Sequence, residues 1–211
     1  MWILWALLSA IFGGITSILA KIGIKNVNSN LATAMRTVVV LIFAWLMVFI
    51  VGSQNTICDI TTKSFVFLIL SGFSTGASWI CYFRALQLGD VNDVVPIDKL
   101  STVLTMILAF VFLGEKITVN KIFGMIAIAV GTYLMVKKDK SYISSCKSTD
   151  FKWLIYACFS AIFAAFTSIL GKIGVENIES NLGTAIRTIV VLIFAWIIVF
   201  AQGKQHEIRK I

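Results

Sequence analysis

Charged residues, proline and histidine are all scarce in this sequence. Of its 211 residues only 13% are charged, 59% are hydrophobic, and there is one proline and one histidine. A soluble domain carries about a quarter charged residues, so this composition excludes a water-soluble protein and leaves a lipid bilayer as the solvent. The four cysteines show no metal-ligand spacing, and the sequence has neither a nucleophile paired with a base nor a phosphate-binding glycine loop. We therefore expect no enzyme activity, no metal site and no cofactor.

The sequence does contain seven long apolar stretches. Each is close to the roughly 20 residues that a helix needs to cross a hydrocarbon core of about 30 Å. None shows the alternation of a membrane barrel, so all of them must satisfy their backbone groups as helices. The sequence thus predicts an all-α, multi-pass membrane protein with seven transmembrane helices. The stretches lie near residues 2–20, 31–51, 64–86, 94–114, 121–137, 153–171 and 182–201.

The first two stretches occur a second time near the C-terminus. Residues 2–60 and 153–211 align without a gap and agree at about 34 of 59 positions, which indicates duplication of a larger module. We expect a complete five-helix repeat over 1–138, a Lys-rich linker over 139–152 and a partial second repeat of two helices over 153–211. Because five spans separate equivalent points of the two copies, the copies should lie antiparallel in the membrane.

Positive charge is concentrated at the ends of the spans and in the linker. The net charge is +8, and about 13 of the 18 lysines and arginines fall on the side of the linker and the C-terminus. Such cations act as topology signals and contact lipid headgroups, so we expect no nucleic-acid partner. The bias predicts an outside N-terminus and a cytoplasmic linker and C-terminus.

Small residues recur at helical spacing on several of the spans. At such positions the backbones of neighbouring membrane helices can approach closely. We therefore predict helix packing at five glycines, which are Gly13, Gly72, Gly76, Gly124 and Gly131.

Three features inside or beside the spans have two interpretations each. Trp79 and Tyr82 continue a stripe of small residues, and they either form an interface belt or line a cavity. Asp98, after the only proline, is either an intramembrane carboxylate facing protein or water, or the solvated N-cap of a span that starts later. Arg36 either extends to the headgroups or holds an anionic group inside the protein.

Four segments together resemble a known family of transporters. LSAIFGGITSILAKIG at 8–23, CYFRALQLGD at 81–90, VPIDKLSTVLTMILAFVFLGEKIT at 95–118 and GMIAIAVGTYLM at 124–135 are similar to the EamA domain, the repeat unit of the drug/metabolite transporter superfamily. The resemblance covers 2–137 as one complete repeat and 153–211 as the opening of a second. It implies ten helices, arranged as two inverted repeats around a central cavity, and secondary transport or export of small metabolites or drugs.

The resemblance also implies where a small-molecule substrate binds. The central cavity would be lined by the first four spans, and we nominate Arg36, Trp79, Tyr82, Asp98 and Lys99 as its lining. Arg36 would hold an anionic group of the substrate. Asp98 would be the coupling carboxylate if transport is driven by protons. The small multidrug-resistance relatives carry a carboxylate in their first helix, and Gly13 and Gly14 stand in that region here.

The second repeat stops after two helices, which predicts a partner. We expect a homodimer or other oligomer in antiparallel arrangement, in which residues 2–137 of a second copy complete the ten-helix cage and the partial hairpin is displaced or peripheral. We expect such a protein in the cell membrane, namely the prokaryotic cytoplasmic membrane. The alternative function is a non-transporting modulator, or a truncated duplicate that only packs with partner subunits.

Overall fold

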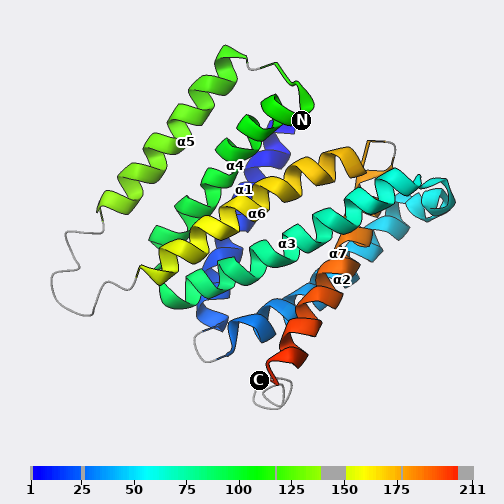
Figure 1. Cartoon of the computed structure of the whole chain (residues 1–211), viewed down its shortest axis with the longest axis horizontal. Helices are drawn as coiled ribbons and strands as arrows, with labels where there is room; N and C mark the ends of the chain where they lie inside the picture. Colours follow the sequence, from blue (N-terminus) through cyan, green and yellow to red (C-terminus); the bar gives the residue numbers. More distant parts are fainter. Residues whose placement is uncertain (1, 25–26, 117, 139–150, 177, 204–211) are drawn as a thin grey trace.

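Helices make up nearly all of the structure, a computed structural model that describes residues 2–24, 27–116, 118–138, 151–176 and 178–203. The all-α class is confirmed, and in these residues seven α-helices and one short 3-10 helix follow one another along the chain (Figure 1). The helices are α1 (Trp2–Gly23), α2 (Ser29–Val51), η1 (Ser53–Asp59), α3 (Thr62–Leu88), α4 (Val91–Leu113), α5 (Val119–Lys138), α6 (Lys152–Gly174) and α7 (Ser180–Ala201).

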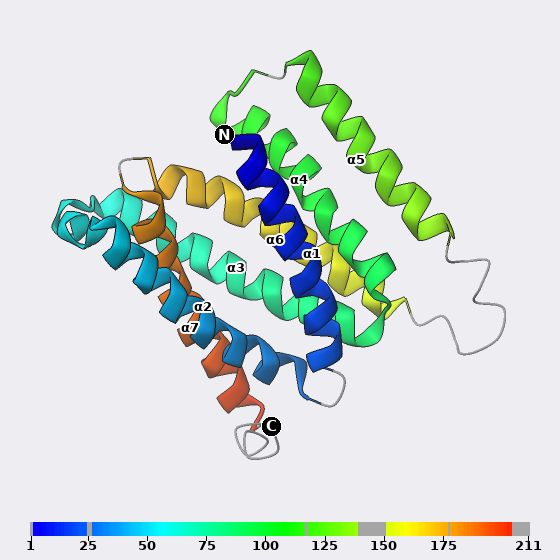
Figure 2. The ribbon, with the colours of Figure 1, turned by 180° about the vertical axis from the view of Figure 1, so that it is seen from behind.

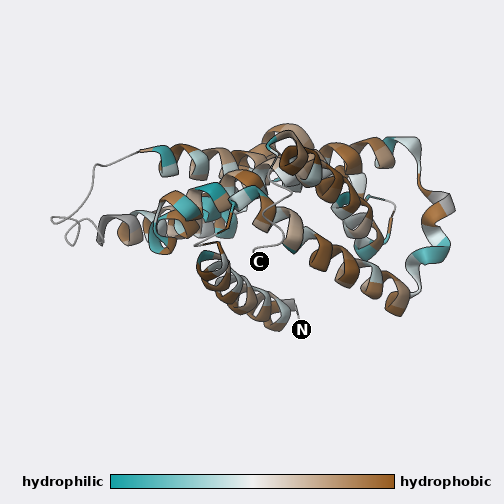
Figure 3. Ribbon diagram, turned by 90° about the horizontal axis from the view of Figure 1, so that it is seen from below, coloured by the Kyte–Doolittle hydropathy of each residue, from teal (hydrophilic) through white to brown (hydrophobic). Residues whose placement is uncertain are grey.

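Six of the seven α-helices are long and apolar enough to cross a membrane. The exception is α5, whose apolar part, Val119–Met135, is shorter. Large hydrophobic side chains are exposed along most of the helices, and Figure 3 shows hydrophobic colours along them and hydrophilic colours at η1. In water such a surface would aggregate, whereas in a bilayer it faces lipid. The chain is therefore a multi-pass membrane protein.

Polar side chains and glycines mark where the helices begin and end. The side chain of Asn28 accepts a hydrogen bond from the Asn30 amide and is the N-cap of α2. The helix therefore begins at Ser29, two residues before the apolar stretch at 31–51. Its counterpart in the second copy, Glu179, caps α7 in the same way. Gly52 and Gly114 end α2 and α4 with φ of 76° and 63°, a left-handed conformation that glycine adopts without steric cost.

The fourth span starts earlier than its apolar stretch. α4 begins at Val91, after Asp90 as N-cap, and it contains Pro96 within the helix. Asp98 is therefore a helical residue in the third turn of α4. The interpretation of Asp98 as the solvated N-cap of a later helix is wrong, because the polar residues before Pro96 are already helical.

The two copies of the hairpin meet opposite ends of α4, as expected for antiparallel copies. Lys21, in the last turn of α1, donates to the carbonyls of Leu86 and Gly89 beside the start of α4, each at 2.5 Å. Lys172, its counterpart in the last turn of α6, pairs with Glu115 just beyond the end of α4. The ribbons of α1 and α6 accordingly run in opposite senses (Figures 1 and 2).

The centre of the fold is α3, which packs between α6 and α7. A Cβ at Gly72 would lie 2.7 Å from the Val190 Cβ, and one at Gly76 would lie 2.6 Å from the Phe194 ring. Both glycines thus allow α3 to touch α7 closely. Within this chain the partial second copy therefore packs directly against α3; where the hairpin lies in an assembly with a second copy stays a prediction. Gly72 and Gly76 are buried rather than left to face lipid.

The remaining three glycines have open surroundings. A Cβ at Gly13, Gly124 or Gly131 would meet no atom within 4 Å. Their predicted role in helix packing needs a neighbour that the described part of this chain does not supply.

Candidate functional site

A polar cavity of about 250 Å³ lies among α1, α2, α3, α4 and α6. Its lining includes all five residues nominated from the sequence, Arg36, Trp79, Tyr82, Asp98 and Lys99. They come from three helices that are far apart in the sequence, so the fold brings them together. Gly13 of α1 and Ala164 of α6, which occupy equivalent positions in the two copies, both line this cavity. The cavity therefore lies between the copies.

The guanidinium of Arg36 lies inside the helical assembly. Its central carbon is 4.6 Å from the centroid of the Trp79 ring and 5.4 Å from that of Phe83, which is within the range of cation–π attraction. Among the described residues no carboxylate pairs with Arg36. The aromatic faces therefore contact its fixed positive charge, and its five N–H donors remain available to a negatively charged group.

Asp98 is held by a hydroxyl group of the second copy. The Ser160 Oγ donates to the Asp98 Oδ1 at 2.7 Å, and the Ser78 Oγ donates to the Ser160 carbonyl at 3.0 Å. This chain of contacts joins α3, α4 and α6 at one edge of the cavity. The carboxylate is partly buried, while the neighbouring Lys99 side chain is exposed.

Tyr82 connects the cavity to α1. Its hydroxyl donates to the Ser17 Oγ at 3.0 Å, and its ring packs edge-on against Phe83. The stripe of small and aromatic residues on α3 thus divides: Trp79 and Tyr82 line the cavity, and Gly72 faces α7.

A wider, more apolar groove continues from the cavity past Arg36. It has a volume of about 380 Å³, lies between α1 and α2, and shares Thr16, Ala20, Arg36 and Phe83 with the cavity. A molecule in the cavity would therefore have apolar space beside Arg36.

Sequence reasoning missed the serines that hold the site together. Ser78 and Ser160 support Asp98, and Ser17 fixes Tyr82. Polar residues at Ser71, Ser74 and Ser78 follow the spacing of one helix face, and this signal could have identified the face of α3 that meets α6.

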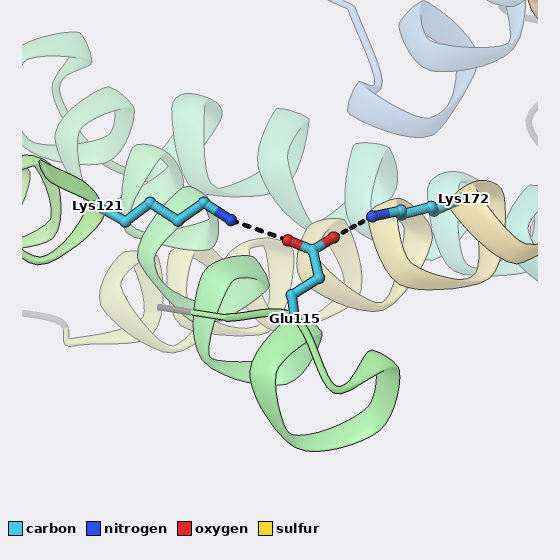
Figure 4. Close-up of polar contacts among 3 residues, drawn as sticks. All are labelled: Glu115, Lys121 and Lys172. Carbon is cyan, nitrogen blue, oxygen red and sulfur yellow. Dashed lines mark hydrogen bonds and ion pairs between the residues drawn. The ribbon is translucent and has the colours of Figure 1, made fainter. Parts of the chain in front are cut away.

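A second charged cluster lies at the other end of α4, where α5 begins and α6 ends. Glu115 stands between Lys172 of α6 and Lys121 of α5 (Figure 4). The Lys121 Nζ is 2.9 Å from the Glu115 Oε2, and Lys172 pairs with the other carboxylate oxygen. These hydrogen bonds, the one from Lys172 first, lower the pKa of Glu115 to about 2. The cluster borders a small cavity of about 160 Å³ and ties the loop after α4 to the second copy.

Helices of membrane-spanning length around a polar cavity with buried charge define a multi-pass membrane protein of the transporter class. The EamA-like transporter family matches residues 1–137, and the chain belongs to this family. Membership points to a transporter that is not an enzyme. No solved structure matches the chain.

Three relatives differ in how much of their own length the match covers. An uncharacterized transporter in the cobO 3′ region of a Sinorhizobium species is 45% identical over 134 residues, or 64% of this chain and 95% of the relative. The uncharacterized transporter YxxF of Bacillus subtilis (strain 168) is 28% identical over 64% of this chain, which spans only 48% of that protein. The uncharacterized protein MJ1333.1 of Methanocaldococcus jannaschii is 25% identical over 63% of this chain and 94% of its own length.

Proposed function

We propose that the chain takes part in secondary transport of small metabolites or drugs that carry a negatively charged group, and that the cavity around Arg36 binds them. One observation carries this proposal: a permanent cation is held between the rings of Trp79 and Phe83, without a carboxylate partner in the described chain, at the boundary of a polar cavity. A charge inside a membrane protein is costly, and one that persists usually serves a ligand or an ion pathway.

The composition of the cavity narrows the class of substrate. Arg36 and Lys99 outnumber the one carboxylate, Asp98, so the lining favours an anion or a zwitterion whose positive end faces Asp98. A cavity of about 250 Å³ suits a small molecule, and the adjoining groove between α1 and α2 offers room for an apolar part.

The test uses the full chain reconstituted in lipid vesicles, with uptake of small anions, zwitterions and cations measured separately. Arg36→Gln removes the cation and should lower uptake of the preferred anionic or zwitterionic substrate about 10- to 100-fold, since a hydrogen bond to a charged group contributes roughly 1.5–3 kcal/mol. Arg84→Gln is the matched control, because Arg84 is an exposed arginine whose hydrogen-bond partner in the described part of the chain is Gln87. Equal losses in the two variants, or undiminished uptake in Arg36→Gln, would exclude the role of Arg36.

Asp98 is proposed as the group that couples transport to protons. It lies at the cavity, and among the described residues its hydrogen-bond partner is the Ser160 hydroxyl, which can bond to either protonation state of a carboxyl group. Asp98→Asn should leave transport without its pH dependence. Asp90→Asn serves as the control, since Asp90 is an exposed N-cap without a side-chain capping bond. Full pH dependence in Asp98→Asn would assign the coupling to another group.

A second candidate function is that of a non-transporting subunit. The observation in its favour is the bare surface of α1, where Phe12 is 64% exposed and Leu19 is 61% exposed. Uptake measurements in vesicles distinguish the two functions. Substrate-specific uptake by vesicles that contain the full chain alone supports transport. Binding of the chain to a partner, with no uptake by the chain alone or together with that partner, supports a non-transporting subunit.

A further inference from the structure

The equivalent lysines of the two hairpins have different kinds of partner. Lys21, in the last turn of α1, donates to the backbone carbonyls of Leu86 and Gly89, each at 2.5 Å. Lys172, in the last turn of α6, pairs instead with the side chain of Glu115. A backbone carbonyl can leave its lysine only if the helix end rearranges, whereas a carboxylate side chain can turn away. Lys172 can therefore exchange its partner more readily than Lys21.

Lysines outnumber the carboxylate at the end of α4. Beside Glu115, the cavity of about 160 Å³ is lined by Lys116, Lys121 and Lys172, so three positive charges meet one negative charge. Each carboxylate oxygen already accepts from one lysine, Oε2 from Lys121 at 2.9 Å and Oε1 from Lys172 (Figure 4). An ammonium group has three N–H donors, and one carboxylate leaves most of the nine donors to other acceptors.

The two hydroxyl groups of the cavity are already engaged as donors. Thr105 and Ser168 each donate to the carbonyl one turn earlier in their own helix, at 2.8 and 3.1 Å. In the described lining the lysines are thus the donors that a ligand meets, next to the apolar side chains of Met106 and Met125. Ammonium donors with surplus positive charge bind groups that only accept hydrogen bonds, such as phosphate, sulfate or carboxylate.

This small cavity continues the helix faces of the cavity around Arg36, which we call the main cavity. On α6, Ala164 lines the main cavity, and Ser168 and Lys172, one and two turns later, line the small one. On α4, Asp98 lines the main cavity, and Thr105, two turns later, lines the small one. A solute that moves along the boundary between α4 and α6 would therefore meet both cavities in turn.

We propose that the cavity among α4, α5 and α6 is a second anion site, in which its three lysines hold an oxyanion group, such as phosphate or sulfate, in competition with Glu115. The ligand takes N–H donors of Lys121 and Lys172, and the Glu115 carboxylate turns away from them. Because this carboxylate is a competitor that stays in place, the ligand is released readily, as a stopping place before Arg36 requires. That role on a transport route rests on the proposed function, and the binding itself does not.

An oxyanion group has two sources at this position. One is a free solute, and the other is the headgroup of an anionic phospholipid, because the cavity lies where the helices end and lipid phosphates are found. Both present the same acceptor oxygens to the lysines, so the test measures each source separately.

Equilibrium dialysis with radiolabelled sulfate, on the full chain purified in a neutral detergent, tests the site without lipid. Lys121→Gln and Lys172→Gln should each weaken sulfate binding about 3- to 10-fold, since each removes a charge-assisted hydrogen bond at a partly exposed site. Glu115→Gln should strengthen binding about twofold or more, because it removes the competing negative charge. Lys63→Gln is the matched control and should change nothing, because Lys63 is an exposed lysine at the start of α3, outside the described lining of the cavity.

The opposite signs separate an anion site from an ion-pair cluster that only holds the loop, since in such a cluster Glu115→Gln and Lys172→Gln remove the same contact. Lys116→Gln covers the case in which those variants fail to fold: Lys116 is not a member of either ion pair of Glu115, and its loss should also weaken binding. Equal binding in Lys63→Gln and Lys172→Gln, or weaker binding in Glu115→Gln, would overturn the proposal. The same series in the Arg36→Gln background removes the contribution of the main cavity, so failure of this site and failure of the transport proposal are distinguished.

Nanodiscs of phosphatidylglycerol or of phosphatidylcholine identify the source of the oxyanion group. Loss of sulfate binding in phosphatidylglycerol, together with native mass spectra in which the wild type retains this lipid and Lys172→Gln releases it, assigns the site to a lipid headgroup. Equal sulfate binding in both lipids assigns it to a solute. If the wild type binds neither sulfate in detergent nor phosphatidylglycerol in nanodiscs, the lysines form no anion site and the proposal is wrong.

Discussion

Replacing Gly72 by alanine should destabilise the protein, because α3 and α7 touch through their backbones at this position. The added Cβ would lie 2.7 Å from the Val190 Cβ and 3.0 Å from the Arg187 carbonyl oxygen. Neither atom can move away by rotation of a side chain. Ordinary contact between such atoms is 3.4–4 Å, so the two helices would have to separate locally by roughly 1 Å.

The expected loss is about 1–3 kcal/mol of unfolding free energy, the usual cost of overpacking a filled interior. It is offset by up to about 1 kcal/mol, since alanine is a better helix former than glycine. At Gly76 the closest atom is Phe194 Cδ1, 2.6 Å from a built Cβ, and the ring can turn. Gly76→Ala should therefore cost less than Gly72→Ala.

Unfolding of the full chain in mixed micelles, followed by far-UV circular dichroism while a denaturing detergent is added, measures these differences. Gly124→Ala and Gly131→Ala are the controls, because a Cβ at either position meets nothing within 4 Å. We expect them to be neutral or slightly stabilising. If Gly72→Ala unfolds at the same detergent fraction as Gly124→Ala, the close contact between α3 and α7 does not exist in the protein.

Two further predictions concern the charged groups at the ends of the helices. Glu115→Gln should lower the thermal unfolding midpoint at neutral pH, because the pKa of Glu115 is lowered from 4.5 to about 2 in the folded chain and its ionised form stabilises the fold. This stabilisation is complete above the unfolded pKa, so the difference in midpoint between variant and wild type should disappear as the pH falls from about 4.5 towards 2. A difference that does not change over this range would show that the carboxylate is not paired. Lys21→Met should expose the end of α1 to proteolysis more than Lys63→Met does, since Lys21 bonds to two carbonyls at the end of α3, and equal cleavage of both variants would contradict that contact.

The sequence was sufficient to predict the helices, because apolar length determines a membrane helix. The five residues that line the cavity were nominated from the resemblance to the family and not from composition or spacing. Their role in binding a substrate stays a prediction. The N-terminus of α4 was less predictable, because Asn92 and Asp93 are polar and yet helical, outside the apolar stretch.

Packing between helices could not be predicted in the same way. The residues around Gly72 and Gly76 in the sequence do not indicate that α7 of the second copy covers these glycines. They also do not indicate that Gly124 and Gly131 have no neighbouring helix atoms within 4 Å of a built Cβ. In lipid an apolar face gains little from being covered by another apolar face. The choice of neighbour then depends on small residues and interhelical hydrogen bonds, whose partners are set by the three-dimensional arrangement.

The duplicated hairpin makes this dependence visible within one molecule. The same residue types are exposed in α1 and covered in α6, and the feature that differs is the row of hydrogen bonds that Ser71, Ser74 and Ser78 of α3 donate to carbonyls of α6. α3 uses its serines for α6 and its glycines for α7, so it binds both helices of one hairpin at once. The cavity lies between α1 and α6, so the contacts of α3 and α4 with α6 also fix one wall of the site that contains Arg36 and Asp98.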